Sequence, residues 1–581
     1  MPTDDRSKSI AEGTGAEILV ESLHRAGVEV VFGLSGDTGV ALYDALYHRR
    51  DEVRHVMARD ERNAAYMADA YARRTNRVGV VEVSSGGGTT YAVGGLGEAF
   101  ASSVPVLVIT SDIHSGSRGT GALTEIDQGL LFAAVTKWRA TVSRADEMPS
   151  LVAEALASAT GGRPAPVCLI VPENVLDEWA RVAFPPASTA VPRERPEAAE
   201  GAIRRAAEAL QRAERPAIVA GSGVHLSGAW SELARLAETT GIPVATTIHG
   251  KGTLSETSPH SLGVVGANGA RDYANECLAE ADVVLFVGTR ANATDTNSYT
   301  SPPREGTIVI QNDIDAERAG RNYPGSIALV GDAKAVLQQL ISTLPQDEES
   351  ERRRRLLDWI AERRRTWIDG NSEPRIPDGE DLLDPRDVVR TIRREASDDV
   401  LLVADPGTPT PNVAAYWETI EAAREVIVPR GHGPMGYTIP AAIGAALSSP
   451  DRRVVGLTAD GSFAMAIGEL ETAVRLQLPI IYVQFSNGSM GWIKMLQHLY
   501  MGKRYFDVDL GPIDAVAVAR GMGLDAARVT SLEEFSEALR RNLASRGPAF
   551  IDVPVPDQIN LVPPVAPWRE ALAGKAGRPV Y

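Results

Sequence analysis

The stretch VVGLTADGSFAMAIGELETAVRLQLPIIYVQFSN, residues 454–487, decides the fold class and indicates where a ligand would bind. An apolar run ends at Ala459–Asp460–Gly461, a helical pattern follows, and a second apolar run ends at Ser486–Asn487. Two buried strands joined by a helix form a βαβ unit of a parallel sheet. Asp460 and Asn487 both follow a strand, so we expect them to meet at the carboxyl edge of the sheet, where open α/β sheets bind ligands.

The residue types at this edge suit a divalent cation that carries phosphate oxygens. One carboxylate, one amide oxygen and a nearby backbone carbonyl are ligands that a hard cation accepts. Gly461 lets the backbone approach closely, and the helix that follows offers N–H donors to a diphosphate. A D-G turn or an N-G turn alone is common, whereas both on one βαβ unit are much rarer. The sequence therefore predicts a cation and diphosphate site here.

The rest of the chain repeats this alternation of strand and helix. Its 581 residues are too many for one core and suggest about three domains. We expect three doubly wound parallel-sheet α/β domains at residues 1–185, 195–345 and 385–560. A Pro-rich stretch at 185–201 is typical of a linker, and the charged segment QDEESERRRRLLDWIAERRR of a solvated connecting helix rather than a nucleic-acid patch. A Pro-rich tail closes the chain.

The first and third domains resemble each other. The first has an Ala-rich helix, then RVGVVEVSSGGG and VPVLVIT, and the third has a similar helix, then RRVVGLTADGSF and LPIIYVQF. Shared α/β patterns could produce this by accident, but the matching order and spacing favour an ancient duplication.

Composition limits the partners and the location. The net charge of −17 argues against nucleic acid. No apolar run is long enough to span a membrane, no signal peptide opens the chain, and MPTDDRSKSIAE is typical of a frayed start, so we expect a cytoplasmic protein with no membrane partner. Cys168 and Cys277 are expected to be reduced packing residues, and the nine histidines show no metal-ligand spacing.

Residues 454–487 resemble the thiamine diphosphate (ThDP) signature of the acetolactate synthase, pyruvate oxidase and 2-oxo acid decarboxylase superfamily, Gly-Asp-Gly followed some two dozen residues later by Asn-Asn. Here ADG and SN keep both metal-ligand types. Further similar segments, in the family's order, cover nearly the whole chain: ARDERNAAYMADAYAR (58–73), SSGGGTT (84–90), GTGALTEIDQ (119–128) and GHGPMGYTIPAAIGA (431–445). The middle domain is similar to that of acetolactate synthase.

The resemblance implies roles for individual residues. Glu61 is the catalytic glutamate that hydrogen-bonds pyrimidine N1′, although in isolation it would be a first-turn charge on a helix. The backbone carbonyl of Gly433 accepts a hydrogen bond from the 4′ nitrogen, and the side chain of Met435 lies between the two rings of the cofactor. His432, beside them, is a substrate contact or only a turn histidine. Mg²⁺ is assigned to Asp460, Asn487 and the carbonyl of Ser489. The residues assigned to ThDP are Gly36, Ser85, Gly86, Gly407, Thr408, Gly433, Met435, Asp460, Gly461, Ser462, Asn487, Ser489, Met490, Gly491 and Trp492.

The substrate positions depart from acetolactate synthase. By the resemblance they are Leu123, Thr124, Gln128, Arg290 and Leu496. The synthase has Phe and Gln where Leu123 and Thr124 stand, and Trp where Leu496 stands. Its Phe-Asp-Asp after Arg290 reads Ala-Asn-Ala here. The resemblance therefore implies intact cofactor machinery and a rebuilt acceptor pocket.

The function that these residues imply is decarboxylation of a 2-oxo acid, followed by ligation of the enamine to an acceptor carbonyl. The alternatives are a simple decarboxylase or flavin-linked oxidase, and a non-catalytic homologue that keeps the fold. The short Gly221–Gly223 turn and Arg290 leave bound FAD open. The family's arrangement also implies a homodimer with the active site between subunits, and commonly a homotetramer.

Overall fold

The computed structural model describes residues 10–191, 195–345, 351–376, 381–574 and 578, and the polar start, part of the linker and the first residues of the charged segment lie outside this part. The chain divides into two compact units. The first comprises residues 1–192, 429–451 and 465–480, and the second comprises residues 193–428, 452–464 and 481–581.

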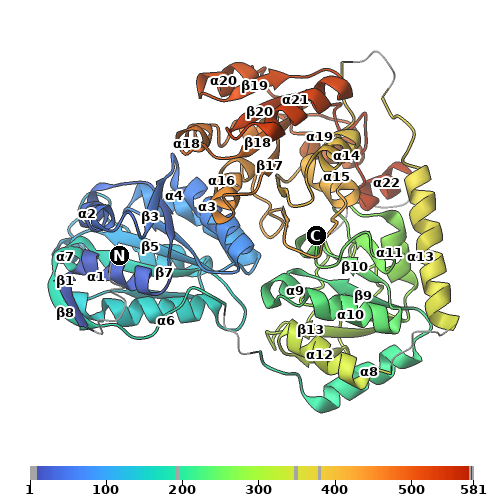
Figure 1. Cartoon of the computed structure of the whole chain (residues 1–581), viewed down its shortest axis with the longest axis horizontal. Helices are drawn as coiled ribbons and strands as arrows, with labels where there is room; N and C mark the ends of the chain where they lie inside the picture. The colour runs from blue at the N-terminus through green and yellow to red at the C-terminus, as the bar shows by residue number, and fades with distance from the viewer. Residues whose placement is uncertain (1–9, 192–194, 346–350, 377–380, 575–577, 579–581) are drawn as a thin grey trace. The chain divides into compact units, whose positions relative to one another are not determined.

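The N-terminal sheet has six parallel strands in the order β3-β2-β4-β5-β7-β6 (Figure 1). Successive side chains point to opposite faces of a strand, so a doubly covered sheet needs apolar residues throughout. Val80 and Leu107 pack under α1, α2 and α6, whereas Phe32 meets Tyr71 of α3 on the other face. The elements of this sheet domain are β1 Ile10–Thr14, α1 Gly15–Arg25, β2 Val30–Gly33, α2 Val40–His48, β3 Arg54–Met57, α3 Glu61–Thr75, β4 Gly79–Val83, α4 Gly87–Ala101, β5 Val106–Asp112, α5 Gln128–Leu131, β6 Trp138–Thr141, α6 Met148–Thr160, β7 Val167–Pro172, α7 Glu173–Asp177 and β8 Trp179–Ala183, with β1 and β8 paired antiparallel.

The central sheet has the strand order β11-β10-β9-β12-β13-β14, which is the dinucleotide-fold order 3-2-1-4-5-6. Alternate residues of its strands enter two cores: Ile218 and Leu285 pack with α8, α10 and α12, whereas Val219 and Phe286 pack with α11 and Ile360 of α13. The elements are α8 Glu200–Arg212, β9 Pro216–Ala220, α9 Ser222–Ser227, α10 Trp230–Thr240, β10 Val244–Thr246, β11 Ser261–Val264, α11 Asp272–Glu280, β12 Val283–Val287, β13 Ile308–Asp313, β14 Ile327–Val330, α12 Ala333–Thr343 and α13 Glu351–Asp369.

The third sheet has the order β16-β15-β17-β18-β20-β19. Its strands share a core with α14, α15 and α21. The elements are α14 Pro385–Glu395, β15 Leu401–Ala404, α15 Pro409–Tyr416, β16 Val426–Ile427, α16 Thr438–Ser448, β17 Val454–Ala459, α17 Asp460–Phe463, α18 Glu469–Arg475, β18 Ile480–Ser486, α19 Gly491–Tyr500, α20 Ala515–Gly521, β19 Asp525–Arg528, α21 Leu532–Ala544, β20 Ala549–Pro554 and α22 Ala566–Leu572. Helices α16 and α18 belong to the first compact unit, where α16 packs along α3.

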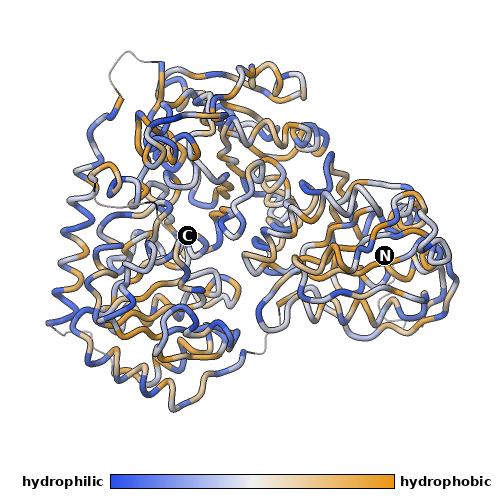
Figure 2. The backbone as a smooth tube through the Cα atoms, turned by 180° about the vertical axis from the view of Figure 1, so that it is seen from behind, coloured by the Kyte–Doolittle hydropathy of each residue, from blue (hydrophilic) through white to orange (hydrophobic). Residues whose placement is uncertain are grey.

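The predicted fold class, three parallel-sheet α/β domains, is confirmed. Numbered within each domain, the N-terminal and third sheets share the order 2-1-3-4-6-5, which agrees with their internal similarity. The charged segment forms α13, whose described residues bury only Ile360, and Figure 2 shows this helix as predominantly hydrophilic. Both cysteines are free thiols, and burial raises the pKa of Cys277 to about 12.

One expectation was wrong. The single helix predicted after Asp460–Gly461 is two short helices, α17 and α18, because the chain leaves helical geometry after Phe463 and restarts at Gly468, which is the N-cap of α18. The Pro-rich tail also contains α22, which buries Trp568 completely. Among the described residues, no helix is long and apolar enough to cross a membrane.

Candidate active site

The segments that follow β17 and β18, which contain Asp460 and Asn487, are joined by hydrogen bonds at the carboxyl edge of the third sheet. Asp460 opens α17, and its Oδ2 accepts from the N–H groups of Asn487 at 3.0 Å and Gly488 at 2.7 Å. Its Oδ1 accepts from the N–H of Gly461 at 2.9 Å. The side-chain oxygen of Asn487 accepts from the N–H of Ser489 at 3.1 Å. The expected meeting of Asp460 and Asn487 at this edge of the sheet is therefore confirmed.

The electrostatics of this turn fit a cation. Burial raises the pKa of Asp460, the three N–H donors oppose this, and the carboxylate of Asp552 adds to it. Keeping this buried carboxylate ionised therefore costs free energy, and a bound divalent ion would offset that cost. Within the described ranges, no group of three or more His, Cys, Asp or Glu side chains could hold a metal. That result is compatible with the predicted Mg²⁺ set, which needs only one carboxylate because an amide, a carbonyl and phosphate supply the other oxygens.

Groups for a diphosphate lie at the neighbouring strand end. Strand order reverses between β15 and β17, which creates the crevice where such sheets bind ligands. Gly407, after β15, has φ +89°, a backbone conformation that favours glycine. Thr408 is the N-cap of α15, and its hydroxyl accepts from Gln558 at 2.9 Å. The hydroxyl of Ser462 is buried and has no hydrogen-bond partner in the part of the chain that the structure describes. An unpaired buried donor of this kind fits a phosphate oxygen.

Glu61 is a buried carboxyl at the start of α3. It is the first residue of that helix, its side chain lies against Gly88, and it is only 8% exposed. Burial raises its pKa, and the carboxylates of Asp60 and Glu82 add to the increase. Among the described residues, its carboxyl makes no hydrogen bond to another side chain. A carboxyl that stays protonated more readily and makes no hydrogen bond to another described side chain fits the role of donor to a ring nitrogen.

The turns after β2 and β4 are packed together at the equivalent edge of the N-terminal sheet. A side chain at Gly36 would collide with Ser84, and one at Gly86, where φ is +73°, would collide with Thr124. The hydroxyls of Ser85 and Thr124 are 2.6 Å apart. The structure thus joins one predicted cofactor turn to one predicted substrate position.

Comparisons with known proteins agree with this geometry. Three family models match: the N-terminal TPP binding domain of thiamine pyrophosphate enzymes at residues 13–131, their central domain at 203–340, and their C-terminal TPP binding domain at 405–553. A probable acetolactate synthase large subunit of Methanocaldococcus jannaschii is 34% identical over 95% of this chain and 93% of its own length. The acetolactate synthase large subunit of Corynebacterium glutamicum is 33% identical over 97% and 90%, and the isozyme 3 large subunit of Escherichia coli is 30% identical over 95% and 96%. The chain belongs to the thiamine pyrophosphate enzyme family.

In this thiamine pyrophosphate enzyme a buried carboxylate holds the turn that carries Gly433. Glu98 of α4, fully buried, accepts from the N–H groups of Gly431 at 3.2 Å, His432 at 2.6 Å and Gly433 at 3.2 Å. Arg73 of α3 donates to the same carboxylate at 2.9 Å. Gly433 has φ +71°, so the turn requires glycine there. His432 is exposed on this turn, with its ring beside Gly97.

The predicted substrate positions have different environments in this enzyme. Leu123 is 84% exposed. Gln128 is buried, with its oxygen accepting from Thr110 and its nitrogen donating to the carbonyl of Ser111, so its polar groups are already paired. Leu496 and Trp492 pack in a small cluster with Trp568. These contacts favour a packing role for Gln128, Leu496 and Trp492, and their substrate and cofactor roles stay predictions.

The crevice of the central sheet is lined by glycine backbone. Gly221 and Gly223 follow β9, and the N–H of Gly223 donates to the carbonyl of Gly288 after β12 at 2.9 Å. A side chain at either position would overlap Gly288. Arg290 follows directly and is half-buried. The glycines are therefore needed for packing whether or not a dinucleotide binds.

Sequence reasoning missed several residues around the metal turn. Asp557 accepts from the hydroxyl of Ser489 at 3.0 Å and pairs with Lys494 at 2.8 Å, and Gln558 donates to Thr408. Both follow β20, which lies next to β18 in the sheet. Both residues follow a strand of a parallel sheet, and this position would have indicated that they lie near the ligand site. From the sequence alone, both residues were placed at the end of the third domain, 385–560, and were given no role.

Proposed function

We propose that this chain is a Mg²⁺-dependent carboligase of the acetolactate synthase type. It would decarboxylate a 2-oxo acid and join the remaining fragment to an acceptor carbonyl. The observation that carries the proposal is the hydrogen-bonded pair Asp460 and Asn487 in a chain that aligns with acetolactate synthase large subunits over at least nine-tenths of both lengths. We further propose that residues 1–185, 195–345 and 385–560 act as pyrimidine-binding, central and diphosphate-binding domains.

Each part of the site has a defined task in this proposal. Bound ThDP supplies a ring carbon that, once deprotonated, attacks the 2-oxo carbonyl. Asp460, Asn487 and the Ser489 carbonyl would hold Mg²⁺, with Ser462 and Thr408 near the phosphates. Glu61 would share its proton with pyrimidine N1′. The carbonyl of Gly433 would accept from the 4′ amino group, and Met435 would keep the two rings in the bent arrangement that proton transfer requires.

The relatives favour carboligation over the alternatives, since those compared are named as acetolactate synthases. Simple decarboxylation would release an aldehyde, and a non-catalytic homologue would consume no 2-oxo acid. Purified chain with ThDP and Mg²⁺ should be given a panel of 2-oxo acids, with and without acceptor carbonyls, and the products identified by mass spectrometry. A ligated 2-hydroxy ketone is expected. Release of aldehyde alone, with every acceptor, would contradict the proposal.

We also propose that the central domain does not retain stoichiometric FAD. Its strand order is that of dinucleotide-binding sheets, but the glycines at its crevice are accounted for by packing on Gly288. Protein purified without added cofactor, then denatured and scanned for released flavin, gives the answer. We expect less than stoichiometric flavin, and a stoichiometric amount would contradict this.

We propose a homodimer as the smallest active species, with a homotetramer as a further prediction and a cytoplasmic location. Large apolar side chains are exposed on both units and support a subunit interface: Tyr91, Leu123 and Leu130 of the first unit, and Phe506 and Ile513 of the second. Covering such surface with a second copy removes it from water. Light scattering at assay concentrations tests this, because an active monomer would contradict it.

A further inference from the structure

A cavity rich in arginine lies in the second compact unit, outside the predicted catalytic residues. It has a volume of about 380 Å³, which is within the range of small-molecule sites. The C-terminal part of α13, the helix α14 and the end of α15 line it. Five lining residues are arginines and one, Glu418, is acidic: Arg271, Arg364, Arg390, Arg393 and Arg394. Four of these arginines also pair with a carboxylate, and Arg364 donates to backbone carbonyls, so what the cavity offers an anion is the donors that these contacts leave unused.

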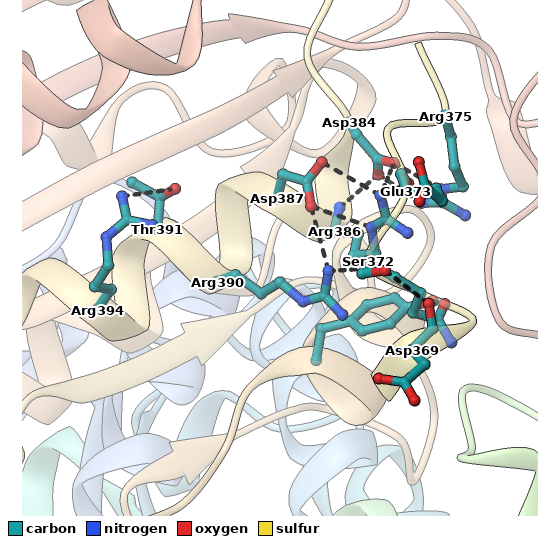
Figure 3. A network of polar contacts seen from close by, with 12 residues as sticks. Asp369, Ser372, Glu373, Arg375, Asp384, Arg386, Asp387, Arg390, Thr391 and Arg394 are labelled. Carbon is teal, nitrogen blue, oxygen red and sulfur yellow. Dashed lines mark hydrogen bonds and ion pairs between the residues drawn. The ribbon is translucent and has the colours of Figure 1, made fainter. Parts of the chain in front are cut away.

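Two of these arginines keep donors available. Arg390 donates through Nη1 to the carbonyl of Asn371 at 2.8 Å and to Asp387 at 3.4 Å. Arg394, one helical turn further along α14, donates through Nε and Nη2 to Glu395. Its Nη2 also donates to Thr391 (Figure 3). Within the described residues, the Nε and Nη2 of Arg390 and the Nη1 of Arg394 make no hydrogen bond. A guanidinium with unused donors binds phosphate oxygens well.

The surrounding contacts hold the arginines in place and limit what the ligand can be. Trp367 stacks on Tyr416 with ring centroids 5.4 Å apart. Arg271 lies over Trp367 at 5.2 Å, and Arg390 over Tyr416 at 5.1 Å. Because both rings already have stacking partners, recognition would depend on charge rather than on stacking of a base.

The charge of Arg390 is also poorly compensated. Burial and the neighbouring cation of Arg386 lower the pKa of Arg390, although Asp387 partly offsets this. Figure 3 shows how Asp384 and Asp387 are shared among Arg375, Arg386 and Arg390. Two carboxylates therefore serve three guanidinium groups, and an anion in the cavity would balance the remaining charge.

We propose that this cavity is a second ligand site, which binds a small phosphorylated anion through Arg390 and Arg394. The site is separate from the ThDP-binding residues, so it could be occupied while the cofactor is bound. It does not depend on the reaction that the enzyme catalyses.

The test is calorimetric titration of full-length protein saturated with ThDP and Mg²⁺, so that the diphosphate site is closed to the probe. The probe is fructose 1,6-bisphosphate, with fructose as the uncharged control. We expect saturable binding that weakens as salt rises. Arg394→Gln should weaken it about tenfold, as expected for loss of one charged hydrogen bond. Arg390→Lys should also weaken it, because an ammonium keeps the charge but loses the planar fork.

Controls separate a specific site from general attraction. Arg541→Gln removes an equally exposed charge outside the cavity and should bind as wild type. Normal ThDP affinity of the Arg390 and Arg394 variants would show that α15, which begins next to Thr408, still folds. Absence of saturable binding to wild type would overturn the proposal. Equal affinity of the cavity variants and wild type, or equal weakening by Arg541→Gln, would also overturn it.

Discussion

Replacing Arg73 by leucine should destabilise the packing of α3 on α16 more than any change to its individual partners. Arg73 is 3% exposed and donates to Asp69 at 2.7 and 3.2 Å and to Glu98 at 2.9 Å. Both carboxylates are fully buried, and Tyr437, the N-cap of α16, donates to Asp69. One guanidinium thus serves two carboxylates. Without it, two buried acids would face each other with no cation.

The structure sets the order of the expected effects. Removing one partner of a buried ion pair costs about 3–5 kcal/mol, and we expect Arg73→Leu near the upper end because two acids lose their partner. Glu98→Gln should cost about 2–3 kcal/mol, since Asp69 still pairs with Arg73 and the amide oxygen still accepts one of the turn's N–H groups. Arg144→Leu removes a pair that is 60% exposed on the arginine side and should cost less than about 1 kcal/mol.

Hydrogen exchange of the α3 amides measures these differences as local opening free energies. The pH dependence gives a second check. Burial and Glu98 already raise the pKa of Asp69, and losing Arg73 raises it further. A carboxyl whose folded pKa is raised contributes stability at low pH that is lost as pH rises, so Arg73→Leu should recover stability on acidification. The reasoning would be refuted if the opening free energy of the α3 amides in Arg73→Leu lay within about 1 kcal/mol of the wild-type value. It would also be refuted if that free energy fell by no more than it does in Glu98→Gln.

Three further predictions concern single residues. Glu61→Ala should keep Mg²⁺–ThDP binding but slow C2–H exchange of bound cofactor, measured by NMR, by roughly 10²–10⁴-fold; near-normal exchange would contradict the assignment. Asp460→Ala removes the one charged metal ligand, so calorimetry should detect no Mg²⁺-dependent ThDP binding, and unchanged affinity would contradict it. His225 is neutral and buried, with Nδ1 accepting from Trp230 and Nε2 facing the carbonyl of Lys251, and burial lowers its pKa to about 3. The contribution of neutral His225 to the free energy of unfolding is complete above its unfolded pKa of about 6.5 and is lost progressively toward pH 3, by about 4–5 kcal/mol. A His225→Phe variant with the same acid sensitivity in denaturant melts would count against this.

The sequence predicted the three sheets because strand and helix periodicities are local. The apolar runs 217–220 and 283–287 became β9 and β12 within one residue at each end. The proximity of Asp460 and Asn487 was also predictable, because carboxyl ends of neighbouring parallel strands share an edge.

The contacts that sequence could not give are those between distant segments. Glu98 follows an Ala/Gly-rich pattern on α4 and would be expected on a solvated face, yet it is buried by Arg73 and by the turn at Gly431, more than 300 residues away. Trp568 lies in the Pro-rich tail, and its burial depends on Met495, a residue of the distant helix α19. Tertiary contacts rather than local propensity fix these positions.

The repeated sheet explains why only one of two similar edges would hold a cation. In both sheets strand order reverses at the same place, between β2 and β4 and between β15 and β17. After β4 the chain reads Ser84–Ser85–Gly86, so hydroxyls and a tight turn face the crevice; after β17 it reads Asp460–Gly461, which places a carboxylate there. A hydroxyl turn can hold a neutral ring but cannot offset two positive charges. A carboxylate beside an amide oxygen can, provided that phosphate supplies the remaining oxygens. In the proposed site, this difference after the strand would place the charged end of the cofactor on the third domain and would leave the ring and the proton donor Glu61 to the first domain.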